Sequence, residues 1–516
     1  MSLYHETADI LSASEGNLKT RVFKKKGLKA TPQQVYALAL ETCKWSSILK
    51  EVIEASELLR HERKLSPLLS LLLVHDFLLS KGGIALPASH GLRASIDRHK
   101  ARLTAEFTRA RIRRKAGSVE ALRQQVATEY LGEAARYPRW VRINTLRSTL
   151  EDQLDSTFKD FTRVYSIGEV TDKNAAPSEK RFYVDEHIPN LLAVSPSFEF
   201  TKTGAYGSGA IILQDKASCF PAYLLDPLPQ DGDVIDSCAA PGNKTTHVAA
   251  LVHSRVRGRE DEPPPPCTQK IFAFEKDKNR ARTLEKMVKL AGAQDTVRIN
   301  FGQDFLKVDP GAELFRDVGA LLLDPSCSGS GIVGRDAMPT IHLPEPPSSS
   351  SSSSAKKKPP AKGSDNSRKR KRPEDDTTEK PKEVFVDDDG EETTITSEKE
   401  LKARLEALGS FQLSLLLHAL EFPAARKVTY STCSIHAEEN EHVVVKALQS
   451  DVAKRKGWRI LRRADQVRGL RDWPVRGMSD ACDGDGEVAE ACIRSYQDDG
   501  RGVMGFFVAG FVRDGP

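Results

Sequence analysis

The stretch Asp236–Thr246, DSCAAPGNKTT, decides the fold of this chain. It follows the apolar pair Val234-Ile235 and leads into Ala249-Ala250-Leu251, which has helical character. Small residues and Gly242 let the backbone approach a ligand closely, and the first turn of the helix presents free N–H groups. The stretch lacks both the Gly-Lys pair of a phosphate-binding P-loop and the glycine spacing of the dinucleotide fingerprint. It therefore predicts a nucleotide-like cofactor beside a strand-to-helix turn.

Residues 206–516 alternate short β-rich runs with helical stretches, which is typical of βαβ units. The expected strands are 234–236, 271–274, 297–299, 320–323, 428–430 and, near the C-terminus, 505–509. This pattern predicts an α/β domain with a doubly wound, largely parallel sheet.

Acidic residues follow two of these strands. Glu275 ends the second strand and could accept hydrogen bonds from ribose hydroxyls, as acidic residues do at this place in open α/β sheets. Asp304 follows the third strand and could accept from an exocyclic amine of adenine, and Arg280 lies on the helix between them. Each carboxylate alone is more often a solvated loop residue, but together they outline the crevice where such sheets bind ligands.

Two cysteines occupy matching positions after strands. Cys327 lies in Asp324-Pro325-Ser326-Cys327, after the strand 320–323, and Cys433 lies in Ser431-Thr432-Cys433, after the strand 428–430. If these strands are parallel neighbours, both thiols emerge at one edge of the sheet. A single cysteine is usually a buried hydrophobe, and a metal site would need further Cys or His ligands at suitable spacing. We therefore expect a reactive pair and no metal.

Methyl transfer to cytosine suits two thiols, a carboxyl group and a cofactor turn. Cytosine C5 is a poor nucleophile toward a sulfonium methyl group, but a thiolate that adds at C6 makes C5 enamine-like. A free cysteine has a pKa of about 8.5, so the attacking thiol would profit from local activation. Asp324 sits where its carboxyl group could stabilise the adduct near N3.

The N-terminal part, residues 1–130, is expected to be helical. Residues 52–59 have helical spacing, and 67–79 are apolar enough for a buried helix. From Arg93 to Arg147 there are fourteen Lys and Arg against five Asp and Glu. Such a local excess fits an RNA backbone as partner, although a solvated arginine-rich helix explains it about equally well.

Residues 131–205 form a separate segment in this interpretation. Residues 139–144 alternate with period two, as a half-exposed strand does. Trp140, Arg142 and Asn144 would share one face, a combination suited to phosphate contacts and base stacking. Ordinary strand alternation accounts for the pattern nearly as well.

Two insertions interrupt the α/β segment. The shorter one, 257–267, contains four consecutive prolines, and the longer one, 343–398, runs from a serine tract to an acidic stretch and is expected to be disordered. Its cluster Arg368–Arg372 resembles a nuclear-import signal or a nucleic-acid tether. The eight cysteines contain no CxxC pair, no apolar run reaches 18 residues, and the N-terminus lacks secretory features. A reducing compartment, cytoplasm or nucleus, and no membrane span are expected.

The sequence resembles the Sun (RsmB-like) family of RNA cytosine-5 methyltransferases, and it looks most similar to the eukaryotic branch of that family, which acts on large-subunit ribosomal RNA. The resemblance covers residues 139–512 and rests on five motifs: Gln214–Ser218, Cys238–Lys244, Asp324–Gly331, Tyr430–Ser434 with Glu438–Glu441, and Gly505–Val508. It implies a Rossmann-like class I methyltransferase core, domain 206–516, preceded by a small α+β RNA-binding subdomain, 131–205, and a helical domain.

The resemblance also implies roles for individual residues. Cys433 would be the nucleophile, Cys327 would assist release of the methylated base, and Asp324 would lie near both the cytosine and the cofactor. The residues expected around S-adenosylmethionine are Cys238, Ala239, Ala240, Pro241, Gly242, Asn243, Lys244, Glu275, Arg280, Asp304 and Asp324.

The implied partner is large-subunit ribosomal RNA or an assembling particle, with a monomer as default. The family branch and the basic cluster together favour the nucleus, and within it the nucleolus. Alternatives are a catalytically silent ribosome-assembly factor, or a methyltransferase for a small molecule or protein, which would leave the paired cysteines unexplained.

Overall fold

The computed structural model describes residues 3–13, 18–23, 25–131, 137–172, 179–196, 198–255, 268–332, 340–345, 383–386, 392–395 and 398–514. The chain divides into two compact units, one of 1–130 with 338–384 and one of 131–337 with 385–516. Among the described residues, no helix is long and apolar enough to cross a membrane.

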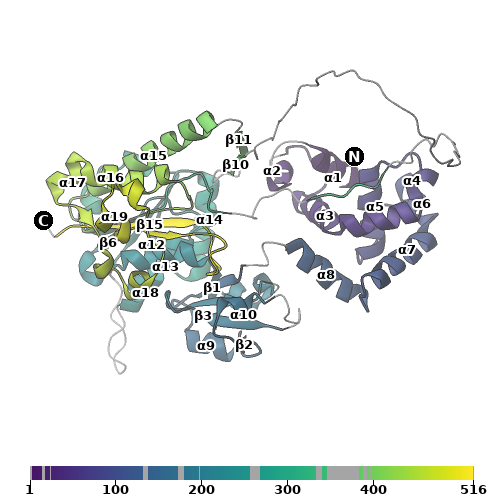
Figure 1. The fold of residues 1–516 in the computed structure, drawn as a ribbon, viewed down its shortest axis with the longest axis horizontal. Coiled ribbons are helices and arrows are strands. Elements are labelled where there is room, and N and C mark those ends of the chain that lie inside the picture. The colour runs from purple at the N-terminus through teal and green to yellow at the C-terminus, as the bar shows by residue number, and fades with distance from the viewer. Residues whose placement is uncertain are drawn as a thin grey trace, which may run out of the picture. The chain divides into compact units, whose positions relative to one another are not determined.

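The first unit is helical (Figure 1). Leu49 and Val52 pack against Leu72 and Val74 in a core that the apolar faces of the longer helices share. The run expected over 52–59 is not one helix, because Glu57 adopts a left-handed conformation (φ 51°) and separates two helices. The helices are α1 (Leu3–Ser12), α2 (Leu18–Phe23), α3 (Pro32–Ala55), α4 (Leu58–His61), α5 (Pro67–Leu79), α6 (Gly91–Asp97), α7 (Lys100–Arg113) and α8 (Val119–Leu131).

Only part of the predicted disordered insertion lies within the described residues. The chain just before and at its start packs on the helical unit: Ile341 contacts its core, and the backbone N–H of Glu345 donates to Glu54 (2.9 Å). Further along, β10 (Glu383–Val386) and β11 (Glu392–Ile395) pair with each other. The serine tract and the cluster 368–372 lie outside the described residues, so disorder there stays a prediction.

The second unit begins with a small sheet of order β2-β3-β4-β1-β5. Its strands are β1 (Arg139–Ile143), β2 (Thr162–Arg163), β3 (Arg181–Val184), β4 (Leu191–Val194) and β5 (Ile211–Leu213), with the short helices α9 (Leu150–Asp155), α10 (Ile167–Val170) and α11 (Gly204–Gly207). The small subdomain therefore extends beyond the predicted boundary at 205.

The larger sheet has the order β13-β15-β12-β9-β6-β7-β8, with β14 paired to β15. The five strands from β12 to β8 are parallel, whereas β15 runs antiparallel to β12, β13 and β14. All six predicted strands are present. The strands are β6 (Asp233–Asp236), β7 (Ile271–Glu275), β8 (Val297–Phe301), β9 (Val318–Leu323), β12 (Lys427–Thr432), β13 (Arg459–Ile460), β14 (Ile493–Ser495) and β15 (Phe506–Val512).

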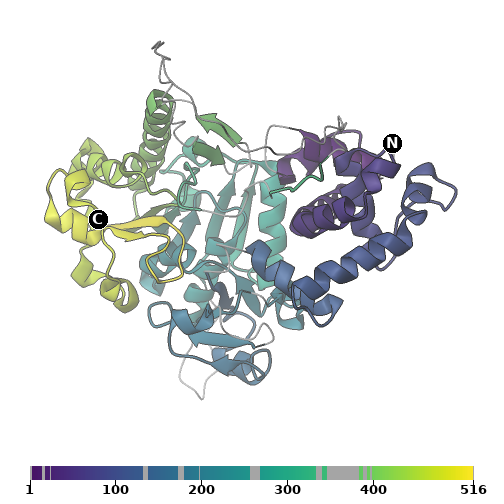
Figure 2. The same ribbon diagram turned by 45° about the vertical axis from the view of Figure 1, so that its right-hand side comes forward.

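Helices cover both faces of this sheet (Figures 1 and 2). Successive strand residues point to opposite sides: Ile235 and Leu321 join one buried cluster, Val234 and Ala320 another. The first side is covered by α15 (Glu398–Leu420), α16 (Glu441–Gln449) and α17 (Asp451–Lys456), the second by α12 (Lys216–Leu225), α13 (Asn243–Arg255) and α14 (Lys278–Ala291). Two further short helices, α18 (Arg468–Asp472) and α19 (Gly486–Ala491), precede β14. The doubly wound α/β core is thus confirmed.

Candidate active site

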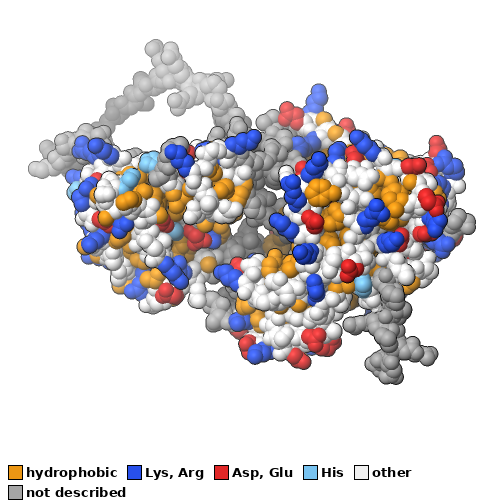
Figure 3. Space-filling model, turned by 180° about the vertical axis from the view of Figure 1, so that it is seen from behind, with side chains coloured by type: hydrophobic (Ala, Val, Ile, Leu, Met, Phe, Trp, Pro, Cys, Tyr) orange, Lys and Arg blue, Asp and Glu red, His pale blue; other side chains and the backbone are white. Residues whose placement is uncertain are grey.

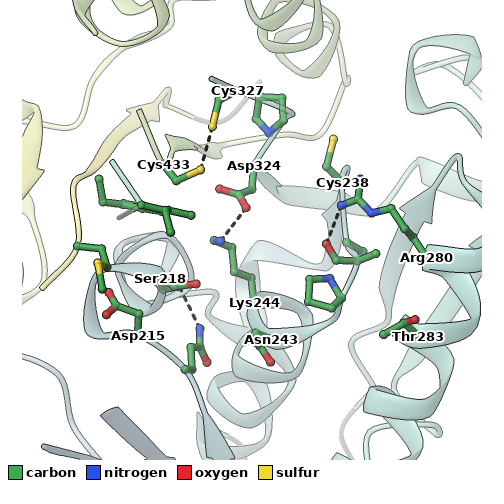
Figure 4. Close-up of a pocket in the computed structure, with 18 of the residues that line it drawn as sticks. Asp215, Ser218, Cys238, Asn243, Lys244, Arg280, Thr283, Asp324, Cys327 and Cys433 are labelled. Carbon is green, nitrogen blue, oxygen red and sulfur yellow. Dashed lines mark hydrogen bonds and ion pairs between the residues drawn. The ribbon is translucent and has the colours of Figure 1, made fainter. Parts of the chain in front are cut away.

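The two predicted thiols meet at the carboxyl edge of the sheet. Strands β9 and β12 are parallel neighbours with Leu323 opposite Tyr430, so the segments that follow them leave the sheet side by side. The Cys327 and Cys433 sulfur atoms lie 3.0 Å apart (Figure 4). Both residues line a cavity of about 450 Å³ at this edge.

An ion pair faces the same cavity. Lys244, in the first turn of α13, places its ammonium nitrogen 2.7 Å from one carboxylate oxygen of Asp324, and the Ser431 hydroxyl donates to the other oxygen (2.6 Å). Burial alone would lower the pKa of Lys244, but the Asp324 carboxylate outweighs burial and raises it. Lys244 therefore stays an ammonium group at neutral pH. Its nitrogen also lies 5.4 Å from the centre of the Phe506 ring, on the cavity wall.

A third cysteine in the cavity differs from the pair. Cys238 belongs to the turn after β6, and burial raises the pKa of its thiol to about 12. Because the attacking species in cysteine chemistry is the thiolate, a thiol that stays protonated at neutral pH is a poor nucleophile. Cys238 is therefore a poor candidate for the attacking thiol.

A network of hydrogen bonds holds the Cys433 segment. The Thr432 hydroxyl donates to the Asn440 side-chain oxygen (2.5 Å), and the Asn440 amide donates to the Ser434 carbonyl (2.9 Å). Glu439 accepts from the Ser328 backbone N–H (2.9 Å) and the Gln412 amide (3.0 Å). Glu439, which follows the Cys433 segment, therefore ties the Cys327 segment to α15.

A buried ion pair also holds the segment that follows Cys433. Glu441 and Arg494 are almost fully enclosed, with 0% and 1% of their side chains exposed, and make a two-point pair at 2.6 and 2.5 Å. Arg494 also donates to the Ile435 carbonyl (2.9 Å), two residues after Cys433. The acidic motif 438–441 thus positions the Cys433 segment and does not line the cavity.

Gly331 brings a third segment to this edge. Its N–H donates to the Cys433 carbonyl (2.8 Å), and its own carbonyl accepts from the N–H of Gly505 (2.8 Å). A Cβ atom at position 331 would overlap the Gly505 carbonyl oxygen and lie 2.8 Å from that of Cys433. Only glycine lets the three segments approach this closely.

The predicted RNA-contacting face of β1 is buried, so that prediction was wrong. Arg142 is 1% exposed and donates to the side chains of Gln214 (2.7 Å) and Thr246 (3.1 Å). The Trp140 indole donates to a backbone carbonyl, as does the Asn144 amide. Period two identified a strand, but both of its faces are covered. Arg142 instead fixes the small sheet to the cofactor-turn helix α13.

Models of known protein families match most of the chain. The N-terminal domain of NOL1/NOP2/Sun domain family member 5 matches residues 33–122, and the ferredoxin-like domain of the same family matches residues 137–214. The 16S rRNA methyltransferase RsmB/F model matches residues 222–348.

Curated relatives agree over nearly the full length. A 25S rRNA (cytosine-C(5))-methyltransferase of Schizosaccharomyces pombe is 38% identical, over 99% of this chain and 91% of that protein. The chain belongs to the NSUN5 family of RNA cytosine-C5 methyltransferases. A 28S rRNA (cytosine-C(5))-methyltransferase of Mus musculus is 33% identical over the same shares of the two chains, and a 26S rRNA enzyme of Caenorhabditis elegans is 27% identical over 99% and 98%. The resemblance stated from the motifs is confirmed, and with it dependence on S-adenosylmethionine.

Most of the predicted site residues of this NSUN5-family chain lie around one cavity. Its lining includes Cys238, Ala239, Ala240, Pro241, Asn243, Lys244, Arg280, Asp324, Cys327 and Cys433. Gly242, Glu275 and Asp304 do not line it. Gly242 has a φ of 111° and backs onto Leu284 and Met287 of α14, so it serves the turn and the packing of α13 on α14.

The two predicted cofactor carboxylates have protein partners. Glu275 accepts from the Asp277 N–H (2.9 Å), with its second oxygen 3.8 Å from Arg280. Asp304 accepts from the Leu306 N–H (3.1 Å) and pairs with Lys276 (3.2 Å). Their predicted contacts to ribose and adenine stay predictions.

The cavity fits the family's cofactor. Its volume is within the range of about 300–1,000 Å³ typical of small-molecule sites. The buried side-chain oxygen of Asn243 has no hydrogen-bond partner among the described residues, so a donor on a bound molecule would satisfy it. The turn 238–244 with Arg280 would hold S-adenosylmethionine beside the thiol pair.

Several lining residues were not predicted as site residues, among them Gln214, Asp215, Ser218, Thr283, Ile332, Met504 and Phe506. Gln214–Ser218 and Phe506 lie in motifs that carried the resemblance, so a signal for them was present without a role. Asp215 accepts from the Ala217 N–H at the start of α12, so a capping motif marked it. Nothing in the sequence marks Met504.

Proposed function

We propose that this chain transfers a methyl group to C5 of a cytosine in large-subunit ribosomal RNA, with Cys433 as nucleophile. The observation that carries the proposal is the pair of sulfur atoms 3.0 Å apart, facing the Lys244–Asp324 ion pair at one sheet edge. Similarity to the 25S and 28S rRNA enzymes supports this substrate class.

Addition of the Cys433 thiolate to C6 forms a C–S bond and pushes electrons from the C5–C6 double bond into the ring. The Lys244 ammonium, held by Asp324, offsets the negative charge that develops, and Asp324 lies where it can face N3 and the amine of the base. S-adenosylmethionine, when bound, supplies the methyl group. Because the site is partly enclosed, these charges are screened less than in water.

Release of the product requires loss of the C5 proton and of the sulfur. Cys327, as its thiolate, accepts the C5 proton. The electrons of the broken C–H bond re-form the C5–C6 double bond, and the Cys433 thiolate departs. The 3.0 Å distance between the two sulfur atoms supports this role, because a cytosine joined to Cys433 at C6 would lie beside the Cys327 thiolate.

Methyl transfer from labelled S-adenosylmethionine to unmethylated large-subunit rRNA tests the reaction. Wild-type protein should place label in 5-methylcytosine, and Cys433→Ala should reduce the rate by at least about 10³-fold while still binding cofactor. Cys43→Ala is the matched control, because burial raises the pKa of that thiol to about 11 in the helical unit. Normal turnover of Cys433→Ala would exclude Cys433 as nucleophile.

We also propose that the protein acts as a monomer in the nucleus, in the nucleolus, on large-subunit rRNA that is either free or within an assembling particle. The basic cluster 368–372 and the similarity to rRNA enzymes support this location. A fluorescent fusion with the five basic residues changed to alanine should leave the nucleus. Unchanged nucleolar signal would exclude the cluster as the import signal.

A further inference from the structure

The exposed face of α14 carries a row of cations. Lys278, Arg282, Lys286 and Lys289 follow each other at spacings of four, four and three residues and are all exposed. At about 100° per residue they fall within roughly 80° of the helix circumference. Glu285 is the one acidic residue among them. The opposite face is apolar and packs on the sheet.

Among the described residues, none of these four cations makes an ion pair, and Arg282 donates a side-chain hydrogen bond to Asn279 (2.9 Å). The charge of Arg282 also acts on the nearby Asp277 carboxylate. The charges of the four cations are therefore available to an external anion.

The other arginine-rich helix, α7, uses its charges internally. Arg102 pairs with Glu57 (3.3 Å), Arg109 with Glu106 (2.7 Å), and Arg113 with Glu51. Arg114, just after the helix, pairs with Glu51 as well. Glu51 and Glu57 lie outside the segment Arg93–Arg147, so a count within that segment could not include them, and they offset part of its basic excess.

The row on α14 begins at the cavity and ends at the small subdomain. Arg280 and Thr283 of the same helix line the cavity. At the other end, the Arg147 guanidinium lies over Gly292 and donates to the Lys289 carbonyl (3.4 Å). A 14-residue helix is about 21 Å long, enough to follow several phosphates. Lys and Arg side chains also gather along one edge of the α/β unit in the space-filling view (Figure 3).

We propose that the exposed face of α14, continued by Arg147, binds the phosphate backbone of the RNA that delivers its cytosine to the cavity. The inference rests on the proposed function, because it names how that site holds its substrate. Neutralising phosphates with lysine and arginine releases counterions, so binding through this face must weaken as salt rises.

RNA affinity measured across a series of salt concentrations tests the proposal. The variant R282E/K286E/K289E should bind a large-subunit rRNA fragment at least about 10-fold more weakly, and its plot of log affinity against log salt should be shallower by about 2 to 3. The matched control K100E/R102E/R109E on α7 should change both quantities much less. In methyl-transfer assays, the α14 variant should show a raised KM for RNA and a nearly unchanged kcat.

The milder R282Q/K286Q/K289Q variant serves if charge reversal lowers the thermal midpoint. Wild-type affinity, salt dependence and KM in the α14 variants would overturn the inference, as would a larger loss in the α7 control. If the α14 variants lost RNA affinity but wild-type protein transferred no methyl group, the proposed function would fail while RNA binding by the α14 face would stand.

Discussion

Two carboxylate ion pairs serve the same edge of the sheet in opposite ways. Glu441 and Arg494 are enclosed beneath the Cys433 segment, whereas Lys244 and Asp324, at 15% and 25% exposure, face the cavity. The enclosed pair fixes backbone, since Arg494 also holds the Ile435 carbonyl. The cavity pair presents charge to reactants. The difference predicts that breaking the first affects mainly stability and breaking the second mainly turnover.

The largest effect on stability is expected for Glu441→Gln. The change leaves the Arg494 guanidinium buried without a counterion, which costs about 3–5 kcal/mol. Urea unfolding followed by far-UV circular dichroism should show the loss. A loss of unfolding free energy below about 1 kcal/mol, close to the effect of a surface substitution, would contradict the structural role of the pair.

Asp324→Asn is expected to lower kcat by about 10²–10³-fold, because a neutral amide no longer holds the Lys244 ammonium as a carboxylate does. The Asp324→Asn variant should unfold at nearly the same urea concentration as wild type, because Asp324 and Lys244 border the cavity and are not enclosed. Single-turnover methyl transfer measures the rate. If Asp324→Asn lost stability as Glu441→Gln does and kept its rate, the two pairs would have to exchange roles.

A third carboxylate, Asp236, lies under the cavity pair and makes stability depend on pH. Burial raises its pKa to about 7 from an unfolded value of 3.8, so the folded state holds its proton more tightly. The folded state therefore loses stability as pH rises between these values and not above 7. The free energy of unfolding of Asp236→Asn, relative to that of wild type, should rise by about 2 kcal/mol between pH 5.5 and pH 8.5. An unchanged difference between the two proteins would show that Asp236 is ionised throughout.

The smallest effect is expected for a change that touches neither pair. Replacing residues 346–382, within the predicted disordered insertion, by a Gly-Ser linker should leave methyl transfer in vitro within about twofold of wild type, because composition gives this segment little apolar surface to bury. The same assay as for Asp324→Asn measures it. A large loss would mean that the insertion contributes to the site or to RNA binding.

The sequence was sufficient for the sheet and for the meeting of Cys327 with Cys433, because apolar strands are local signals and parallel neighbours share a carboxyl edge. It was insufficient where a role depends on what covers a residue. Arg142 alternates like a surface residue and is buried under α13. Gly242 belongs to the cofactor turn and backs onto α14.

Long-range partners were also beyond reach from sequence. Glu441 meets Arg494 across 53 residues, so the acidic motif could be seen but not its purpose. Arg102 and Arg113 of α7 pair with Glu57 and Glu51, which lie 45 and 62 residues earlier in the chain. The basic excess therefore predicted an RNA contact that these ion pairs weaken.

The most direct test of the account asks which of the two thiols bonds to the base. RNA carrying 5-fluorocytosine at the target position has no C5 proton to lose, so the adduct formed during methyl transfer cannot release the enzyme. Peptide mass mapping of the trapped complex should find the nucleotide on Cys433. A nucleotide on Cys327 would contradict the assignment and reverse the roles of the two cysteines.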